Sequence, residues 1–222
     1  MNADGRGLKV AVNALNLPRH PAGISQYVRC LYARLAQSPE IAAVTLHIPA
    51  HAAEFFGGLH PKVRLRIYRI GSAIAGTLCS QALLPLRTRG DDLLHSVGNI
   101  AVLASRIPQL VTVHDLCHKT VPDRFGPVKR VYLTWGLALS TWMGRSRYVC
   151  VSENTLRDLI RFHPRAGGKA GVVHSAARFP VGRGGSPRGP RLLCVGTIEP
   201  GKNLMLAFRA LARHLPRPEF QR

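Results

Sequence analysis

Carboxylates are scarce in this sequence. Of its 222 residues only 11 are Asp or Glu, against 31 Lys or Arg, so the formal net charge at pH 7 is +20. An excess of positive charge favours polyanionic partners, which include nucleic acid, acidic lipid head groups and sugar diphosphates. The basic residues are spread along the whole chain, so charge alone does not choose among these partners.

Paired cysteines and a targeting segment are also missing. Five cysteines occur singly, without a Cys-x-x-Cys pair: Cys30, Cys79, Cys117, Cys150 and Cys194. Their scatter favours buried free thiols in a reducing compartment over disulfides or a metal site. Residues 1–7 are polar and lack the apolar core of a signal peptide. The sequence therefore predicts a cytoplasmic protein with no metal centre.

No apolar run is long enough for a convincing membrane span. The longest uncharged stretch, Ile70 to Leu86, is too short and too polar, and arginines flank it on both sides, at positions 64, 66, 69, 87 and 89. An apolar segment between cationic flanks suits a helix lying on an anionic membrane surface. An ordinary core helix explains the same pattern and is favoured on packing grounds. The first interpretation would place the protein peripherally on an inner membrane.

What the sequence does contain is an alternation of strand and helix patterns. Strands are expected near residues 8–13, 44–48, 63–67, 92–96, 111–113, 147–151 and 171–175. Helices are expected at 24–35, 72–86, from 127 onward and after Ser152. This order predicts an α/β fold with a doubly wound, Rossmann-like parallel sheet. In the helix from residue 127, the expected buried face consists of Val128, Val131, Tyr132, Trp135 and Leu139.

Composition divides the chain into unequal parts. Residues 1–177 are expected to form the first domain, and residues 178–190, rich in Gly, Pro and Arg, a linker. Residues 191–222 then supply one strand and a helix from Asn203. One strand and one helix cannot bury a core, so this part is expected to be the start of a second Rossmann-like domain.

Two positions stand where such sheets bind ligands. His114 and Asp115 directly follow the apolar strand 111–113, and open α/β sheets bind ligands outside the carboxyl ends of their strands. Gly23 lies between the first strand and its helix, where free amides and the helix dipole favour an anion. The alternatives stay open at this point: His114 could simply bind a loop carbonyl, and Gly23 could be a turn glycine.

A near P-loop follows the linker. Residues 196–203 read Gly-Thr-Ile-Glu-Pro-Gly-Lys-Asn, close to Gly-x-x-x-x-Gly-Lys-[Ser/Thr]. Asn203 replaces the hydroxyl that would hold Mg²⁺, and Pro200 removes an amide from the phosphate cradle. These departures disfavour an ATPase or GTPase.

Four segments together resemble a known family. They are Gly23-Ile-Ser-Gln-Tyr-Val, Val113-His-Asp, Val151-Ser-Glu-Asn-Thr, and Val195-Gly-Thr-Ile-Glu-Pro-Gly-Lys-Asn-Leu. Each is loose alone, but the four in this order resemble the family 4 retaining glycosyltransferases (group 1), enzymes of the two-Rossmann-domain GT-B type. In such enzymes the second domain mainly holds the nucleotide-sugar and the first mainly holds the acceptor.

The resemblance implies a role for individual residues. Gly23 and Gly196 would approach the donor diphosphate, Lys202 would neutralise the departing phosphate, and His114 would face the reacting sugar. No separate cofactor is implied. The donor would be GDP-mannose-like, with mannose- or rhamnose-type transfer favoured, and the acceptor a lipid-linked sugar or a polysaccharide in bacterial surface glycan (lipopolysaccharide) synthesis.

The chain stops before the segment that, in this family, grips the donor sugar. The resemblance therefore implies a transferase truncated early in its second domain, with little or no transfer by these 222 residues alone. The rival class is a basic nucleic-acid-binding protein. The aromatic residues Tyr27, Tyr132 and Trp135 fall on apolar helix faces, and no RNA-binding signature is present, so no nucleic-acid partner is predicted.

Overall fold

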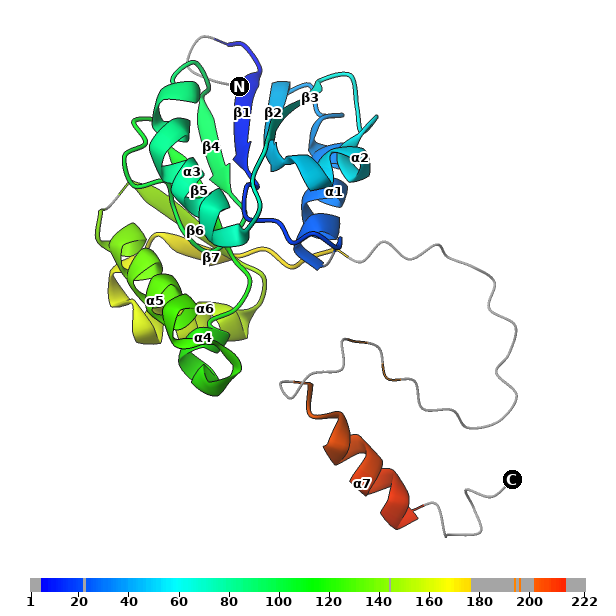
Figure 1. The fold of residues 1–222 in the computed structure, drawn as a ribbon. Helices are drawn as coiled ribbons and strands as arrows, with labels where there is room; N and C mark the ends of the chain where they lie inside the picture. Colours follow the sequence, from blue (N-terminus) through cyan, green and yellow to red (C-terminus); the bar gives the residue numbers. More distant parts are fainter. Residues whose placement is uncertain are drawn as a thin grey trace.

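A single parallel sheet organises the structure, which is a computed structural model. It describes residues 5–21, 23–143, 145–176, 194, 196 and 202–214. Seven strands pair in the order β3-β2-β1-β4-β5-β6-β7, and every neighbouring pair is parallel. Helices cover the sheet on both faces (Figure 1). The doubly wound, Rossmann-like α/β fold predicted from the sequence is confirmed.

The strands have the following bounds: β1 Leu8–Asn13, β2 Ile41–Pro49, β3 Val63–Tyr68, β4 Leu93–Ser96, β5 Gln109–Val113, β6 Ser146–Cys150 and β7 Ala170–Val172. The longer helices are α1 Gly23–Leu35, α3 Ala73–Arg87, α5 Pro127–Trp142, α6 Glu153–Phe162 and α7 Leu204–His214. Short helices are α2 Ala53–Phe56, α4 Cys117–Thr120 and the 3₁₀ turns η1 Ala50–Ala52, η2 Pro122–Arg124 and η3 Pro164–Ala166.

Two helix starts follow from hydroxyl caps. The Ser72 side chain accepts a hydrogen bond from the Ala75 amide at the start of α3, and Ser152 accepts one from Thr155 at the start of α6. Each bond satisfies an amide that the helix itself leaves free. Glu153 adds a favourable charge in the first turn of α6.

The strand order reverses between β1 and β4. From β1 the chain winds outward through β2 to β3, then α3 returns it to β4, and β5, β6 and β7 extend the sheet the other way. Figure 1 shows α1 and α2 on one side of the sheet and α3 and α5 on the other. Ligands of doubly wound sheets bind at such a reversal, outside the carboxyl ends of the strands.

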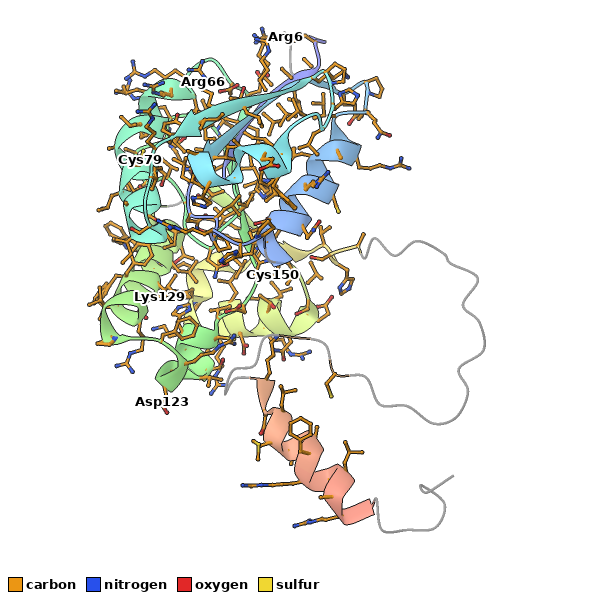
Figure 2. All side chains as sticks on the ribbon, turned by 45° about the vertical axis from the view of Figure 1, so that its right-hand side comes forward. Arg6, Arg66, Cys79, Asp123, Lys129 and Cys150 are labelled. Atoms are coloured by element: carbon orange, nitrogen blue, oxygen red, sulfur yellow. The ribbon has the colours of Figure 1, made fainter. Side chains whose placement is uncertain are left out.

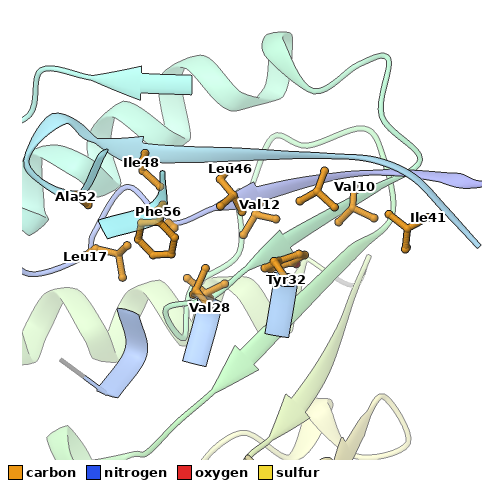
Figure 3. Close-up of a cluster of buried hydrophobic side chains, with 13 residues drawn as sticks. Val10, Val12, Leu17, Val28, Tyr32, Ile41, Leu46, Ile48, Ala52 and Phe56 are labelled. Atoms are coloured by element: carbon orange, nitrogen blue, oxygen red, sulfur yellow. The ribbon is translucent and has the colours of Figure 1, made fainter. Parts of the chain in front are cut away.

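Alternation along the strands divides the core between the two faces. Val10 and Val12 of β1 point toward α1, where they meet Val28 and Tyr32 in the largest apolar cluster (Figure 3). Ala11 points the other way and packs with Leu84 of α3. Burial of about 25 cal/mol per Å² of apolar surface makes such clusters the main stabilising term.

Helix α5 packs on the same face as α3. Its Leu137 contacts Val111 and Tyr148, which lie on the β5 and β6 strands. Ala11 pairs in register with Leu94, and Leu94 with Gln109. Since residues 109 and 111 share one side of β5, the partners of α3 and α5 belong to one face of the sheet.

The predicted buried face of α5 is wrong. Tyr132 is half-buried, but Val128, Val131, Trp135 and Leu139 are exposed, Trp135 to 64%. The face of α5 that packs on the sheet is narrower than the predicted one. It consists of Leu137, Ser140 and Thr141. Gly136 lies so close to Ile100 that an added Cβ would sit 2.6 Å from the Ile100 Cδ1 atom. Small residues let α5 approach the sheet, and this leaves its bulky stripe outside.

The predicted strands of the first domain and the last predicted helix are present in the structure. Strands form at each predicted segment, although the last extends only over Ala170–Val172, and helix α7 follows Asn203 as predicted. The proposed linker and the strand after it fall almost wholly outside the described residues, so the domain boundaries at 177 and 190 stay predictions. In the part of the chain that the structure describes, no helix combines the length and apolarity needed to cross a bilayer.

Candidate functional site

The reversal between β1 and β4 brings asparagines to the ligand edge of the sheet. Asn13 and Ser96 are the last residues of these strands, and they pair in register. Asn16 lies against Gly98, where an added Cβ would come 2.1 Å from the Asn16 Nδ2 atom. The cavity there measures about 10 Å³, enough for one water molecule. This enclosed space is therefore too small for an organic ligand.

His114 follows β5, one strand away from the reversal, and Asn99 fixes its backbone. The Asn99 Oδ1 atom accepts a hydrogen bond from the His114 amide at 3.0 Å, and the Asn99 Nδ2 donates to the Asp115 carbonyl at 3.1 Å. Thr155 adds a bond from its hydroxyl to the His114 carbonyl at 3.3 Å. Asn99 adopts a left-handed conformation with φ of 61°, which asparagine tolerates better than most residues.

The imidazole of His114 is held in one tautomer. Its Nε2 lies 3.1 Å from the Val97 carbonyl oxygen, which can only accept, so Nε2 carries the proton. Burial is the main influence on this ring and lowers the pKa of His114 below its usual value. His114 is therefore neutral at pH 7, and its Nδ1 is an acceptor with no partner among the described residues. The alternative considered from the sequence, in which His114 bonds a loop carbonyl, therefore also holds, because its Nε2 bonds the Val97 carbonyl.

Helix α1 reaches this histidine through Tyr27. The two rings meet edge to face with centroids 5.1 Å apart, a favourable aromatic geometry. The Tyr27 hydroxyl bonds Thr112 at 3.1 Å, and Thr112 bonds His95 at 2.7 Å. His95 in turn bonds the buried Tyr32 hydroxyl. This buried polar chain ties α1 to β4 and β5 and fixes the position of the Tyr27 ring.

Asp115 is exposed, and its carboxylate begins a helix. The Oδ1 atom accepts the Cys117 amide at 2.9 Å, which stabilises the first turn of α4. This contact makes Asp115 a capping residue of the loop before α4. Burial and the nearby Asp115 raise the pKa of the Cys117 thiol, so this cysteine is protonated at neutral pH.

Gly23 begins α1 on the same side of the sheet. Nothing lies within 4 Å of a Cβ added there, so the surrounding space is open. Tyr27 follows one turn later, about 6 Å along the helix axis, and touches His114. The structure thus brings Gly23 and His114 into one neighbourhood, and its packing does not require a glycine at position 23.

Gly196 and Lys202 also come together. The Lys202 side chain folds toward Gly196, with its Cε atom 3.8 Å from the position of an added Cβ. None of the contacts described for His114 involves either residue. The four predicted site residues therefore form two groups: Gly23 with His114, and Gly196 with Lys202.

Two further cavities are larger, one at the amino ends of the strands and one beside α4, which begins three residues after His114. One of about 240 Å³ opens near Gln109 and Ser146, at the amino ends of β5 and β6. The other, about 350 Å³, lies between α4 and α5 and is bordered by His118, Lys119 and Arg130. Within the described ranges, no three His, Cys, Asp or Glu side chains gather closely enough to hold a metal ion.

Sequence reasoning missed the residues that hold His114. Asn99 follows β4 directly, at the strand end nearest the reversal, and that position was the available signal. Tyr27 was assigned only to an apolar helix face. The sequence offered no sign of the bonds among Thr112, His95 and Tyr32, because these residues are 17 to 80 positions apart and meet only when β4, β5 and α1 are packed together.

Comparisons with known proteins establish the fold alone. No family model matches this chain, and no curated protein matches its sequence. Among solved structures it is similar to HepE (Alr3699) of Anabaena, determined in complex with UDP and glucose, with a TM-score of 0.52 at 15% sequence identity. The match covers 77% of this chain and 45% of HepE, so the chain spans less than half of that structure. The likeness supports the Rossmann-type, GT-B-like fold implied by the sequence motifs.

Buried histidines make stability depend on pH. Burial lowers the pKa of both His95 and His47 from 6.5 to about 4. Above pH 6.5 these groups are neutral in both states, but below it the unfolded chain takes up protons that the folded chain refuses. The free energy of unfolding should therefore fall as the pH drops from about 6.5 to 4, by about 3 kcal/mol for His95.

Urea unfolding at a series of pH values measures this effect. The variant His95→Gln should lose part of the pH slope while keeping a side chain that can bond Tyr32 or Thr112. A free energy of unfolding that stays constant between pH 7 and pH 4.5 would contradict the assignment.

Proposed function

We propose that this chain carries the acceptor-side domain of a nucleotide-sugar-dependent glycosyltransferase. The observation that carries the proposal is a neutral His114 with an unoccupied acceptor nitrogen, fixed at the ligand edge of a fold similar to that of HepE. HepE was solved with UDP and glucose. Four sequence segments resembling family 4 retaining enzymes support the same assignment.

His114 supplies a hydrogen-bond acceptor to a sugar hydroxyl. Because Nε2–H is engaged by the Val97 carbonyl, only Nδ1 can meet a substrate, and it does so as an acceptor. Asn99 and Tyr27 hold the ring from two sides. A fixed acceptor orients the hydroxyl without reorganisation during the reaction, and orientation of this kind lowers a transfer barrier.

The donor diphosphate meets amides and a cation. Amides at the start of α1 beside Gly23 face the open ligand edge, and helix N-termini attract phosphate. Lys202, with its side chain along Gly196, neutralises the charge that grows on the leaving diphosphate. No cofactor is part of this proposal. The donor we favour is GDP-mannose-like, and the acceptor is a lipid-linked sugar or glycan of a bacterial surface polysaccharide.

Calorimetry and a transfer assay test the proposal. GDP-mannose and UDP-glucose are titrated into the chain, and release of nucleoside diphosphate is followed with a prenyl-diphosphate-linked sugar as acceptor. His114→Ala should reduce turnover by about 10- to 100-fold, since a hydrogen bond fixed in the transition state is worth about 1.5–3 kcal/mol.

A histidine at the other edge of the sheet supplies the control. His60 precedes β3 at its amino end, where it accepts a bond from the Lys62 amide. His60→Ala should leave turnover and donor affinity unchanged. Acceptor binding or turnover that is the same in His114→Ala as in wild type would refute the assignment.

A further inference from the structure

The outward sides of α3 and α5 form one apolar surface that nothing in the described structure covers. We define the α3–α5 surface by these exposed side chains: Ile74, Leu78, Leu83, Leu86, Val128, Val131, Trp135, Leu139, Trp142 and Met143. Both helices pack on the same face of the sheet, so their outward sides point the same way. Figure 2 shows the side chains, with Cys79 of α3 and Lys129 of α5 labelled along one side of the molecule.

The two helices also touch each other. Tyr132 of α5 and Thr77 of α3 both line the small cavity beside Gly76. Contiguous exposed apolar surface of this extent marks an interaction site, because isolated exposed apolar residues would not align along two adjoining helices. Leu78 is 66% exposed and Trp135 64% exposed.

Tryptophan is concentrated on this surface. The chain has two tryptophans, Trp135 and Trp142, and both lie on α5 with 64% of their surface exposed. The guanidinium of Arg165 stands 5.9 Å from the centre of the Trp142 ring. Tryptophan beside a cation is typical of segments that sit at the level of lipid head groups, since the ring has an apolar body and a polar N–H.

The charged residues within α3 and α5 are all basic. Neither α3 nor α5 contains an Asp or Glu, whereas Arg87, Lys129 and Arg130 belong to them. Arg66 of the neighbouring edge strand lies near Arg87, and both influence His47. The whole chain carries +20. A protein partner would have to supply many carboxylates in the right places, whereas an anionic bilayer offers a continuous negative surface.

A basic pocket opens within this surface. The cavity of about 350 Å³ between α4 and α5 is lined by His118, Lys119 and Arg130 together with Val131 and Trp135. His118 is only 2% exposed, and its Nε2 has no hydrogen-bond partner among the described residues. A buried, unpartnered nitrogen beside two cations suits an anionic oxygen.

We propose that the α3–α5 surface docks on an anionic phospholipid bilayer, with the pocket between α4 and α5 receiving the phosphate of one head group. The apolar stripes of both helices enter the head-group boundary, as in amphipathic helices that lie in the membrane plane. The inference rests on this surface alone and does not depend on sugar transfer.

The two tryptophans report docking directly. The full chain is mixed with vesicles of phosphatidylcholine, with and without phosphatidylglycerol, and both tryptophan emission and flotation are measured. Emission should shift to the blue on the phosphatidylglycerol vesicles, with affinity about tenfold or more above that for phosphatidylcholine, and this difference should shrink at high salt. Equal binding to both vesicles, or no shift, would overturn the proposal.

Matched variants locate the contact. Arg130→Gln should weaken binding more than Lys129→Gln, because both lie on α5 but only Arg130 lines the pocket. Arg34→Gln, on the other face of the sheet, removes the same charge and should have the smallest effect, with Arg130→Gln costing about fivefold or more. Equal losses for Lys129→Gln and Arg130→Gln would refute the pocket.

The apolar contact has its own control. Leu78→Ser should weaken vesicle binding. Val173→Ser should not, because Val173 is similarly exposed, at 62%, but follows β7 and lies outside the α3–α5 surface. An unchanged unfolding midpoint confirms that each variant is folded. A chain that is dimeric in solution and becomes monomeric on Leu78→Ser would assign the surface to contact between two copies and overturn the proposal.

Discussion

Replacing Lys202 with Ala is expected to produce the largest loss of function of any single change in this chain. We expect binding of GDP-mannose or UDP-glucose to weaken by about 10- to 100-fold, because a hydrogen bond to a charged group is worth about 1.5–3 kcal/mol. Turnover, where it is measurable, should fall by about 10²- to 10³-fold, by analogy with the loss of one donor that stabilises a developing oxyanion.

Lys202 should matter most in the transition state, because the leaving diphosphate gains its negative charge there. A departing nucleoside diphosphate gains negative charge as the bond to the sugar breaks, so a fixed cation stabilises the transition state more than the ground state. The Lys202 side chain lies along Gly196, with its Cε atom 3.8 Å from the position of an added Cβ. Its effect should therefore fall more on kcat than on KM.

Two variants give this experiment its controls. Lys202→Arg keeps the charge and should retain most of the binding, whereas Lys129→Ala removes an equal charge from the exposed side of α5 and should leave donor affinity unchanged. Calorimetry with each nucleotide-sugar measures the difference. Wild-type affinity in Lys202→Ala would remove this residue from the donor site.

The order of the elements could be predicted because it depends on local patterns. Alternating apolar strands and amphipathic helices, with a serine cap at Ser152, already indicate a doubly wound sheet. The position of His114 at a strand end also follows from the sequence. What holds His114 does not, since Asn99, Tyr27 and Val97 reach it only after β4, β5 and α1 are assembled.

The inward face of α5 shows another limit of pattern reading. Its large apolar residues form the clearer helical stripe, and burial of large side chains is the usual outcome. The helix instead buries Leu137, Ser140 and Thr141, and at Gly136 it approaches Ile100 too closely for any side chain to fit between them. The residue pattern of one helix does not reveal the shape of the sheet surface on which that helix packs.

Gly76 is expected to be the glycine whose replacement destabilises the fold most. An added Cβ would lie 2.1 Å from the Leu15 carbonyl oxygen and 2.7 Å from its carbon. Both are backbone atoms, so no side-chain rotation relieves the clash. We expect Gly76→Ala to lower the free energy of unfolding by about 3 kcal/mol, the upper end of typical overpacking costs, despite a gain of about 1 kcal/mol in helix propensity.

The same substitution should also disturb the ligand edge. The turn of Leu15 and Asn16 is held between Gly76 of α3 and Gly98 after β4, where Asn16 leaves no space for a side chain. Moving α3 outward would loosen this turn and the end of β1 beside it. Nucleotide-sugar binding should therefore weaken in Gly76→Ala even at temperatures where the chain remains folded.

Urea unfolding of Gly76→Ala and Gly90→Ala separates this clash from a general effect of removing glycine. Nothing lies within 4 Å of a Cβ added at Gly90, so that variant should match or slightly exceed wild-type stability, because alanine restricts the unfolded chain. A loss of about 3 kcal/mol shifts the folding equilibrium by roughly a hundredfold. Equal stability of the two variants would show that α3 does not pack against the Leu15 backbone as closely as the structure shows.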